Sequence, residues 1–314
     1  MHSFIKIGSI MNYISVKQAA EQWGLSDRRV RLLCEQGKIP SVLKEGRSYL
    51  IPQDAVKPAD RRGLRGKSIP EEYAKVFARV DALKEELTKR RPLSQGELQQ
   101  LQNEFLVEFT YNSNAIEGNT LTLHETALVL EGLTIDQKPL KDHLEAVGHR
   151  DAFLYVQQLV TEKAPISEKI IKDIHSLVLM NRPEDKGVYR KIPVRIMGAF
   201  HEPPQPYLVP VQMEQLISGQ KKIKRHAIEN AALFHLDFEG IHPFVDGNGR
   251  TGRLLLNLML MEHGYLPIDV KFADRKRYYA CFDSYYKDKT ASPLVTIIAQ
   301  YQEERLRQYL AILS

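Results

Sequence analysis

Hydrophobic residues recur at helical spacing along most of the chain from residue 70 onward. Apolar positions three and four residues apart lie on one face of a helix, so this period predicts amphipathic helices. The expected helices are 70–90, 94–112, 124–132, 142–162, 167–180, 210–238, 248–263, 274–287 and 291–312. Residues 188–209 break the pattern because they are rich in β-branched residues and proline, and they predict an irregular hairpin. The pattern therefore predicts a mainly α fold.

A different and shorter pattern precedes this region, over residues 12–60. Residues 15–36 predict two short helices separated by Gly24, because a glycine commonly ends a helix. Two β-like runs around Glu45 and Gly46 then predict a hairpin. Helix, tight turn, helix and hairpin in this order resemble the small winged helix-turn-helix domains of the excisionase and MerR type.

Charge sets this segment apart from the remainder of the chain. The chain carries a net charge of +5 at pH 7, yet residues 1–66 hold 12 basic and 6 acidic residues, a net +6. A basic module on a near-neutral body is typical of nucleic-acid binding, although a solvated face on a protein-binding domain fits the same pattern. Winged domains contact phosphates from the second helix and the wing. The candidate DNA contacts at those places are Arg28, Arg29, Arg31, Lys44 and Arg47.

Composition narrows the class of protein. Hydrophobic residues make up 43% of the chain and charged residues 26%, which is typical of a soluble globular protein. No run of 18 or more apolar residues occurs, so no membrane span is expected. The N-terminus lacks the apolar stretch of a secretory signal, and the two cysteines, Cys34 and Cys281, are expected as inert buried thiols. These features favour a cytoplasmic protein.

Residues 61–69 predict a linker between the N-terminal module and the helical region.

Residues 247–252, GNGRTG, match the G-x-G-x-x-G pattern of dinucleotide-binding folds. That fingerprint needs a buried strand directly before the glycines, whereas residues 230–246 have helical spacing and then contain Pro243. A kinase-type glycine loop needs a strand on each side, and here the helix 248–263 follows. The motif therefore predicts neither nucleotide fold. The helix that follows is apolar nearly all round, which predicts a buried position at the centre of a helical domain.

The glycines instead open the N-terminus of this helix. Free backbone amides and the helix dipole favour an anion there. Arg250 and Arg253 share one face of the first turn, and two cations beside open amides favour a polyphosphate. Asp246 offers a hard oxygen ligand for Mg²⁺ on that phosphate, and His242 offers a group that takes a proton near neutral pH.

The whole stretch HPFVDGNGRTGR, residues 242–253, resembles the Fic family signature H-P-F-x-[D/E]-G-N-G-R-x-x-R at every fixed position. The resemblance implies a Fic-type helical bundle with a β-hairpin flap over the site. It places the Fic core at 164–300, related helices at 70–163 and a C-terminal helix at 301–314. Most members with Asp at the position of Asp246 transfer AMP from ATP to a target protein, so the resemblance implies a protein adenylyltransferase.

The resemblance also implies a role for each motif residue. His242 would be the base that deprotonates a Ser, Thr or Tyr hydroxyl of the target, and Asp246 would hold Mg²⁺ between the phosphates. Backbone amides around the glycines, with the Asn248 side chain, would form an anion hole. The two arginines would bind the β- and γ-phosphates, and two tyrosines would lie near the adenine unless one of them only packs. The residues expected at ATP are Asp246, Gly247, Asn248, Gly249, Arg250, Arg253, Tyr278 and Tyr279.

Residues 192–208 fit the flap of the family. A flap strand would pair with an extended segment of the target by β-augmentation, and an ordinary surface hairpin is the alternative. The residues expected in that strand are Arg195, Ile196, Met197 and Gly198.

A second family motif lies upstream at residues 113–118, SNAIEG, which resembles the inhibitory pattern [S/T]-x-x-x-E-[G/N]. Ser113 and Glu117 are four residues apart on one helical face. In the family this glutamate pairs with the second arginine of the signature, here Arg253, and removes it from the γ-phosphate. The resemblance therefore implies a self-inhibited enzyme with an inhibitory helix at about 105–118.

Two further functions compete with AMP transfer. One is removal of AMP from a modified target, with Glu117 orienting a water molecule. The other is a DNA-binding regulator in which the Fic part acts as a sensor. The candidate partners are a target protein with a hydroxyl side chain, DNA at the N-terminal domain and a second copy of the chain, and no membrane partner is expected.

Overall fold

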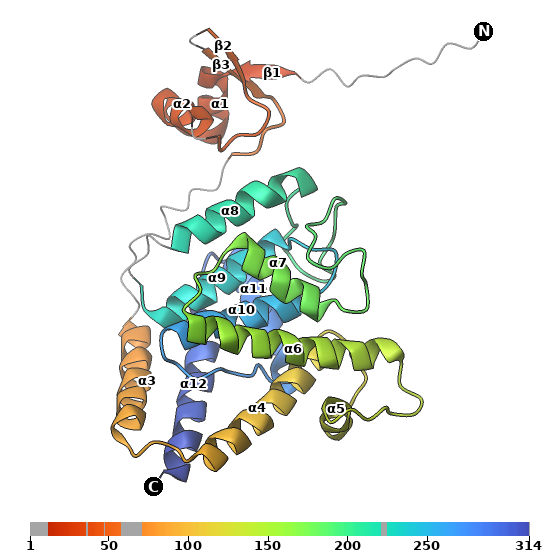
Figure 1. The fold of residues 1–314 in the computed structure, drawn as a ribbon. Helices are drawn as coiled ribbons and strands as arrows, with labels where there is room; N and C mark the ends of the chain where they lie inside the picture. Colours follow the sequence, from red (N-terminus) through yellow and green to blue (C-terminus); the bar gives the residue numbers. More distant parts are fainter. Residues whose placement is uncertain (1–11, 36, 47, 58–70, 221–224, 314) are drawn as a thin grey trace, which may run out of the picture. The chain divides into compact units, whose positions relative to one another are not determined.

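The computed structural model divides the chain into two compact units, Met1–Pro70 and Glu71–Ser314 (Figure 1). The residues it describes are 12–35, 37–46, 48–57, 71–220 and 225–313. The linker expected at 61–69 lies outside the described residues.

The first unit is a small α/β domain. Its elements are β1 (Tyr13–Ser15), α1 (Val16–Trp23), α2 (Asp27–Glu35), β2 (Leu43–Glu45) and β3 (Ser48–Pro52). The strands form an antiparallel sheet in the order β1-β3-β2, and the β2–β3 pair is the predicted hairpin. Gly24 ends α1 in the left-handed conformation, with φ 63°, as the predicted turn requires. The short strand β1 was not predicted, because three residues carry too little pattern.

Buried side chains of α1, α2 and β3 form the core of this unit. Around that core, Arg28 and Arg31 are exposed on α2, Lys44 is exposed on β2, and Arg29 is half-buried. Of the candidate DNA contacts, Arg47 lies outside the described residues. The four candidate contacts that the structure describes thus lie on the second helix and the hairpin, as the winged-domain pattern predicted.

The second unit is helical. Its elements are α3 (Glu71–Lys89), α4 (Gln95–Ile116), α5 (Leu123–Leu130), α6 (Leu140–Glu162), α7 (Glu168–Val178), the 3₁₀ turn η2 (Pro206–Leu208), α8 (Val209–Gln220), α9 (Ala227–Ile241), α10 (Asn248–Glu262), the 3₁₀ turn η3 (Phe272–Asp274), α11 (Arg275–Lys287) and α12 (Ser292–Ile312). The mainly α class is confirmed. The predicted helices agree with these bounds to within four residues, except over 210–238.

The single helix predicted over 210–238 is wrong, because α8 and α9 are separate helices. His226 has an extended conformation, with φ −57° and ψ 142°. Its ring nitrogen accepts a hydrogen bond from the Ile228 amide at 3.3 Å and so caps α9. The apolar period continues across this interruption, which is why the sequence suggested one helix.

The hairpin predicted over 188–209 is also wrong. The structure assigns no strand to residues 188–205, and η2 and α8 follow directly. Prolines at 193, 203 and 204 supply no amide for a strand ladder. The expected flap strand contains a turn instead, in which the Ala199 amide donates to the Ile196 carbonyl at 3.2 Å and Gly198 has φ 77°.

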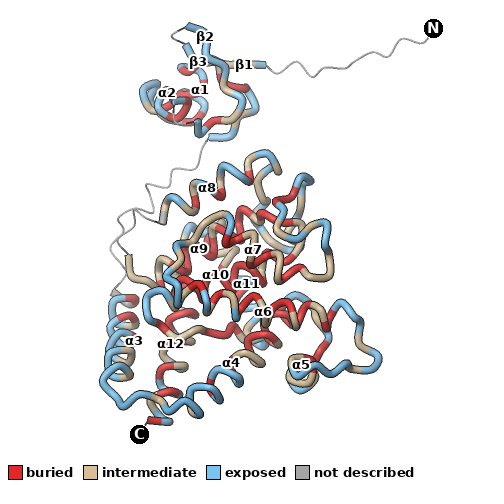
Figure 2. The backbone as a smooth tube through the Cα atoms, in the orientation of Figure 1, coloured by how far each residue is buried: buried red, intermediate tan, exposed pale blue. Residues whose placement is uncertain are grey.

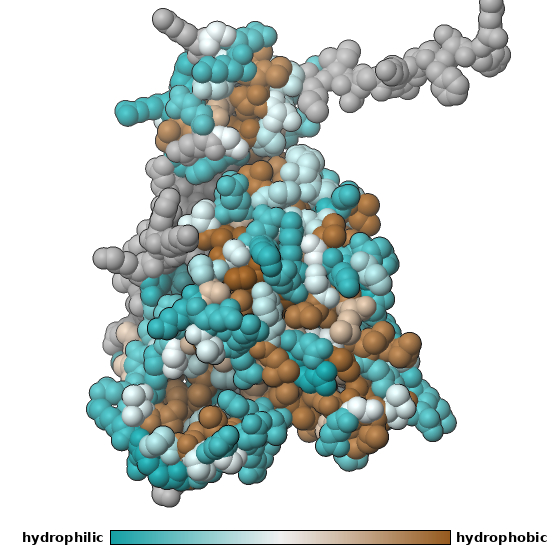
Figure 3. All heavy atoms as spheres, viewed as in Figure 1, coloured by the Kyte–Doolittle hydropathy of each residue, from teal (hydrophilic) through white to brown (hydrophobic). Residues whose placement is uncertain are grey.

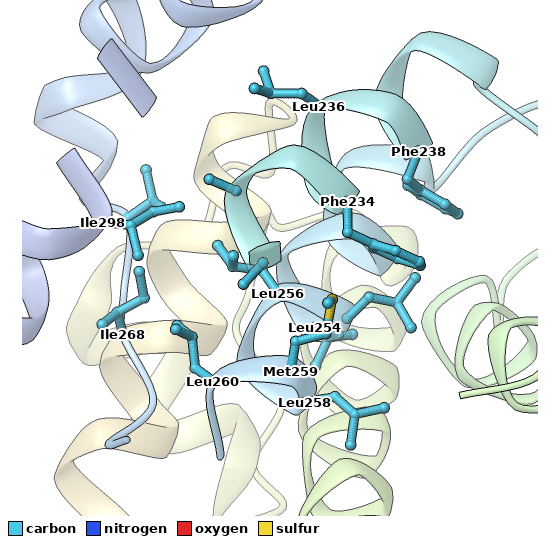
Figure 4. Packing of buried hydrophobic residues seen from close by; sticks show 14 of the residues in the cluster. Phe234, Leu236, Phe238, Leu254, Leu256, Leu258, Met259, Leu260, Ile268 and Ile298 are labelled. Carbon is cyan, nitrogen blue, oxygen red and sulfur yellow. The ribbon is translucent and has the colours of Figure 1, made fainter. Parts of the chain in front are cut away.

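The core of the second unit surrounds α10, as the apolar pattern predicted. Figure 2 marks α9 and α10 as largely buried, and Figure 4 places Phe234 of α9 and Leu256 of α10 in one packed cluster. Even the two arginines of α10, Arg250 and Arg253, are only 2% and 1% exposed. The N-terminus of α10 therefore brings its charges and amides into the interior of the unit.

The two cysteines are buried, Cys34 in the first unit and Cys281 in the second. Burial raises the pKa of the Cys281 thiol to about 11, which keeps it protonated at neutral pH. Both positions agree with the expectation of inert thiols.

No helix in the described part of the chain is long and apolar enough to cross a membrane. On the face seen in Figure 3, hydrophobic residues occur in patches between hydrophilic ones.

The central place of α10 makes a prediction about stability. Leu256→Ala should lower the free energy of unfolding by about 2–5 kcal/mol, because it leaves a cavity in a fully packed core. Leu154→Ala is the matched control, since Leu154 is 47% exposed on α6, and it should change stability by less than about 0.5 kcal/mol. Urea unfolding followed by circular dichroism at 222 nm measures both, and equal effects would contradict a core centred on α10.

Candidate active site

The site is built on the loop between α9 and α10. His242 ends α9 in a left-handed conformation, with φ 48°, and Gly247, with φ 75°, begins the turn into α10. No side chain caps α10. The amides of its first turn have no acceptor within the helix, so they face outward as open donors. This geometry gives an anion-binding nest at the predicted place.

The Asn248 side chain closes this loop. Its Oδ1 accepts from the Phe244 amide and its Nδ2 donates to the Phe244 carbonyl, both at 2.9 Å. We expected this side chain in the anion hole, but both of its polar ends are engaged by the main chain of one residue. In this structure its contribution is to shape the loop that presents the amides.

His242 is a neutral imidazole with one free nitrogen. Its Nδ1 lies 3.3 Å from the Glu239 carbonyl. A carbonyl only accepts, so Nδ1 carries the proton and Nε2 keeps its lone pair. Burial, together with the nearby charge of Arg190, lowers the pKa of His242 to about 4. At neutral pH Nε2 can therefore take a proton, as a general base must.

Arg253 is buried and held by the inhibitory motif. Its Nε donates to Ser113 Oγ at 3.0 Å, and its Nη2 donates to the Ser113 carbonyl at 2.7 Å. The same Nη2 pairs with Glu117 Oε1 at 2.8 Å. Burial alone would lower the pKa of Arg253, but Glu117, together with Tyr278 and Glu239, more than offsets this and raises it. The expected contact between Glu117 and Arg253 is present.

Glu117 also touches the anion nest itself. A Cβ atom at position 249 would collide with Glu117 Oε1 and would lie 3.1 Å from Arg253 Nη1. The absence of a side chain at Gly249 thus gives the carboxylate room on the first turn of α10. A carboxylate in this place has the helix dipole and a guanidinium as neighbours, the same surroundings that suit a phosphate.

Arg250 is paired with acids on two sides. Its Nη1 lies 3.1 Å from Glu145 Oε1 of α6, and its Nη2 lies 3.5 Å from Asp246 Oδ1. Glu145 Oε2 also accepts from Asn119 Nδ2 at 3.0 Å, just after the inhibitory motif. Sequence reasoning missed Glu145, because one glutamate on a distant helix carries no local pattern. It links the first arginine of the signature to the turn that carries Glu117.

Asp246 is half-exposed in the loop between α9 and α10, just before α10 begins. Its Oδ1 accepts from the Gly247 amide at 2.6 Å, and its Oδ2 lies 3.7 Å from Arg182 Nη1. Burial alone would raise the pKa of Asp246, but Arg250 and the Gly247 amide more than offset this and lower it. The ionised carboxylate is a hard ligand that fits Mg²⁺. Within the residue ranges that the structure describes, no three metal-ligating side chains form a cluster. Further ligands of a Mg²⁺ ion would therefore come from a phosphate or water.

His175 of α7 supports the same loop and was also missed. Its ring stacks on Phe244 with centroids 3.6 Å apart. Its Nδ1 accepts from the Gly187 amide at 2.8 Å, so its Nε2 carries the proton and donates to the Asp246 carbonyl at 2.9 Å. Burial lowers the pKa of His175 to about 4, so the ring stays neutral. A lone histidine on an apolar helix face gave no signal of this role.

The two candidate adenine residues differ in environment. Tyr278 is 1% exposed and its hydroxyl lies 2.6 Å from His235 Nε2, so it packs in the core. Tyr279 is 43% exposed and donates to the Ile116 carbonyl at 3.3 Å, at the end of the inhibitory helix. Of the pair, Tyr279 has an aromatic face that a ligand can reach.

Of the expected flap residues, Met197 is 92% exposed, and Arg195 and Gly198 are also exposed. They lie in the loop between α7 and η2 rather than in a strand, as described above. The structure therefore presents them to solvent but does not arrange them as a preformed edge.

Glu239 is a buried acid beneath the site. Its Oε2 lies 3.8 Å from His242 Nδ1, and a Cβ atom at position 252 would collide with its Oε1. The absence of a side chain at Gly252 therefore permits this close packing. Burial, reinforced by Glu117, raises the pKa of Glu239 to about 8. At neutral pH this carboxyl is mostly protonated.

Comparison with known proteins agrees with the geometry. A family model described as the Fic/DOC family matches residues 165–260, and one described as a helix-turn-helix domain matches residues 13–57. Two relatives named protein adenylyltransferase Fic are those of Drosophila melanogaster, 35% identical over 222 residues, and Nematostella vectensis, 30% identical over 331 aligned positions. The first alignment covers 69% of this chain and 44% of the relative, and the second covers 97% and 77%. The chain thus spans less than half the length of the Drosophila protein.

Solved structures give the same picture of the second unit. Fic-1 from C. elegans is similar with a TM-score of 0.69 and 29% identity, covering 77% of this chain and 73% of that one. A Fic domain containing signaling protein from Bacteroides thetaiotaomicron has a TM-score of 0.66 and 28% identity, covering 76% and 94%.

The raised pKa of Glu239 predicts a dependence of stability on pH. The reference pKa of a glutamate is 4.5, so between pH 4.5 and about 8 the folded protein keeps a proton that the unfolded chain releases. The free energy of unfolding then falls as the pH rises through this window. Glu239→Gln keeps the shape of the neutral side chain. The free energy of unfolding of this variant, relative to that of the parent, should therefore be higher at pH 8 than at pH 5.

Urea unfolding of both proteins at the two pH values measures this difference. Glu104→Gln, at an exposed position on α4, is the matched control and should show the same difference from the parent at both. A stability difference for Glu239→Gln that does not change with pH would contradict the protonated state.

Proposed function

Because the chain belongs to the Fic/DOC family, we propose that it transfers AMP from ATP to a Ser, Thr or Tyr hydroxyl of a target protein. The observation that carries the proposal is the pairing of a neutral base, His242, with an open amide nest and a buried cation, Arg253. Its curated relatives are named protein adenylyltransferases, which supports the same reaction.

The reaction is an in-line displacement at the α-phosphorus of ATP. His242 Nε2 takes the proton of the target hydroxyl, and the oxygen forms a bond to the α-phosphorus as the bond to the β-phosphate oxygen breaks. Pyrophosphate leaves, and the AMP stays on the target. The neutral state of His242 at pH 7 supports this role, because a protonated imidazole could not accept the proton.

Preformed donors stabilise the charge on the phosphate oxygens. The open amides of Asn248 and Gly249, in the loop that Gly247 begins, would act as the anion hole, and Arg253 would bind the γ-phosphate. Arg250 would bind the β-phosphate from its place between two acids. Asp246 would hold Mg²⁺, which neutralises phosphate charge when bound. Tyr279 would lie near the adenine.

The enzyme is self-inhibited in this proposal. The Glu117 carboxylate pairs with Arg253 Nη2 and fills the space next to the Gly249 Cα. ATP cannot place its γ-phosphate on Arg253 while the carboxylate is there, because both anions need the same donors. Removing the carboxylate should therefore open the site.

This arrangement gives the first test of function. Glu117→Gly should raise AMP transfer from labelled ATP to the chain itself at least tenfold, on the order of what one additional donor to the phosphates contributes. Adding His242→Ala should abolish transfer. Incorporation of ³²P from α-labelled ATP in the presence of Mg²⁺ measures both.

Glu131→Gly is the matched control, because Glu131 also follows a helix (α5) and precedes a glycine but is exposed. It should leave the low activity unchanged. An inactive Glu117→Gly protein would overturn the proposal. Release of free AMP by the parent, but not by Glu117→Gly, from chains modified beforehand would favour the reverse reaction, with Glu117 orienting water.

A second candidate function belongs to the first unit. We propose that this winged helix-turn-helix unit binds DNA. The helix-turn-helix model matches residues 13–57, and Arg28, Arg31 and Lys44 are exposed on the elements that such domains present to DNA. Exposed cations at these places bind phosphates with a strong dependence on salt.

A mobility-shift assay with duplex DNA of mixed sequence tests this function. Replacing Arg28 and Arg31 together by Ala should weaken binding and lower the slope of log K against log salt by about 1 for each phosphate that the protein no longer neutralises. Replacing Lys89 and Arg90 together by Ala removes the same charge from exposed positions at the C-terminal end of α3 and should have no effect. Absence of a shift at 50 mM salt, or equal weakening in both double variants, would contradict DNA binding.

A further inference from the structure

A third buried arginine lies beside the site, outside the signature motif. Arg190 is 3% exposed. Every hydrogen bond that its guanidinium makes within the described residues ends on a backbone carbonyl. Burial lowers the pKa of Arg190, but an arginine still stays charged at neutral pH. A buried charge of this kind is costly unless its hydrogen bonds do something for the fold or the site.

Two of these bonds hold the end of α9. Arg190 Nε donates to the His242 carbonyl at 2.8 Å, and its Nη2 lies 3.4 Å from the Ile241 carbonyl. The last carbonyls of a helix lack partners within it, and a cation there also suits the helix dipole. The Arg190 amide donates to the Pro243 carbonyl at 2.9 Å. Arg190 thereby fixes both peptide groups around His242, whose left-handed φ of 48° needs outside support.

The other two bonds hold the flap loop, which we define as residues 191–205. Arg190 Nη1 donates to the Ile192 carbonyl at 3.2 Å, and Nη2 donates to the Pro204 carbonyl at 2.5 Å. These carbonyls lie at opposite ends of the flap loop, so the guanidinium closes its base. Between them, Met197 is 92% exposed. The loop therefore has a fixed base and an exposed tip although it contains no strand.

We propose that Arg190 is a positioning residue that fixes the catalytic base His242 and the flap loop relative to each other, so that a target hydroxyl reaches the base. The inference rests on the proposed AMP transfer. A planar guanidinium has donors in fixed directions and can bridge carbonyls of two segments, whereas a lysine has one compact head group. Arg190 thus has two separable properties, its forked geometry and its charge.

The charge acts on the base as well. The charged groups that influence His242 are Arg190, which lowers the imidazole pKa, and Glu117 and Asp246, which raise it. The buried Glu239 carboxyl lies 3.8 Å from His242 Nδ1. Loss of the Arg190 charge should therefore raise the pKa of His242, and activity that needs the neutral base should begin at a higher pH.

In the experiment, the full chain with Glu117→Gly is the parent enzyme. The protein acceptor is the inactive His242→Ala chain, prepared at a different size so that the two proteins can be told apart. Arg190→Lys and Arg190→Gln should each lower kcat/KM for the acceptor on the order of 10–100-fold, because the flap loop is no longer fixed to the base. The KM for ATP should stay within about twofold, since Arg190 contacts no residue assigned to the phosphates. Only Arg190→Gln should move the acid limb of the pH profile to higher pH.

Arg225→Gln is the matched control. Arg225 lies at the other end of α9, where its Nε is 3.5 Å from Glu229 Oε1, and its replacement should leave both constants and the pH profile unchanged. Circular dichroism checks that each variant is folded. If Arg190→Gln does not fold, the acceptor kcat/KM of Arg190→Lys decides the question.

Folded Arg190 variants that keep the parent's kcat/KM for the acceptor would overturn the inference. An equal decrease of kcat/KM for ATP and for the acceptor, with the same pH profile in the Lys and Gln variants, would also overturn it. If the Glu117→Gly parent itself transfers no AMP, the proposed function fails instead. The role of Arg190 is then tested by two measurements that do not depend on enzyme activity. Arg190→Gln should raise the NMR titration midpoint of the His242 imidazole, and both Arg190 variants should speed amide exchange in residues 191–205; no change in either would overturn it.

Discussion

A buried positive charge is costly unless acceptors or an opposite charge compensate it, and Arg253 imposes this condition on the rest of the site. Its guanidinium is 1% exposed and is held by Ser113 and Glu117 of the α4 region. Removing one member of a buried pair typically costs several kcal/mol, because the other charge is left without compensation. In the proposed reaction the γ-phosphate is the only other anion of suitable shape. The inhibitory motif and the substrate are then alternative ways to satisfy one charge, and no separate regulatory site is needed.

The position of α10 explains why this charge is buried at all. A helix that is apolar nearly all round lies at the centre of the unit, and its first turn carries both signature arginines into the core with it. Each arginine then meets an acid from a different helix, Arg253 from α4 and Arg250 from α6. Asn119 joins these two acids, because it follows Glu117 in the chain and donates to Glu145. The turn that carries Glu117 and the proposed phosphate site form one connected set of polar contacts.

The sequence was informative where the signal was local and less so where it depended on distant contacts. The helix periods, the glycines that open α10 and the spacing of Ser113 and Glu117 all lie within a few residues, and the structure has these elements in place. The break at His226 was missed because the apolar period runs through it. β-Branched residues predicted a hairpin over 188–209, and the family resemblance placed the flap strand within it, but the prolines at 193, 203 and 204 supply no amide for a ladder. Glu145, His175 and Arg190 act across long separations in the chain, and each is a single residue without a pattern around it.

Gly249 also sets how such an enzyme can lose its restraint by mutation. The space above its Cα holds the Glu117 carboxylate in this structure, and the same space would admit a phosphate when the carboxylate leaves. In the proposed mechanism, a side chain at 249 would displace the Glu117 carboxylate and also obstruct the nucleotide. On this proposal, a substitution at position 249 would replace the state blocked by Glu117 with a state in which the new side chain blocks ATP. On the proposed mechanism, activating variants are therefore expected at Glu117 or in the helix before it rather than at Gly249.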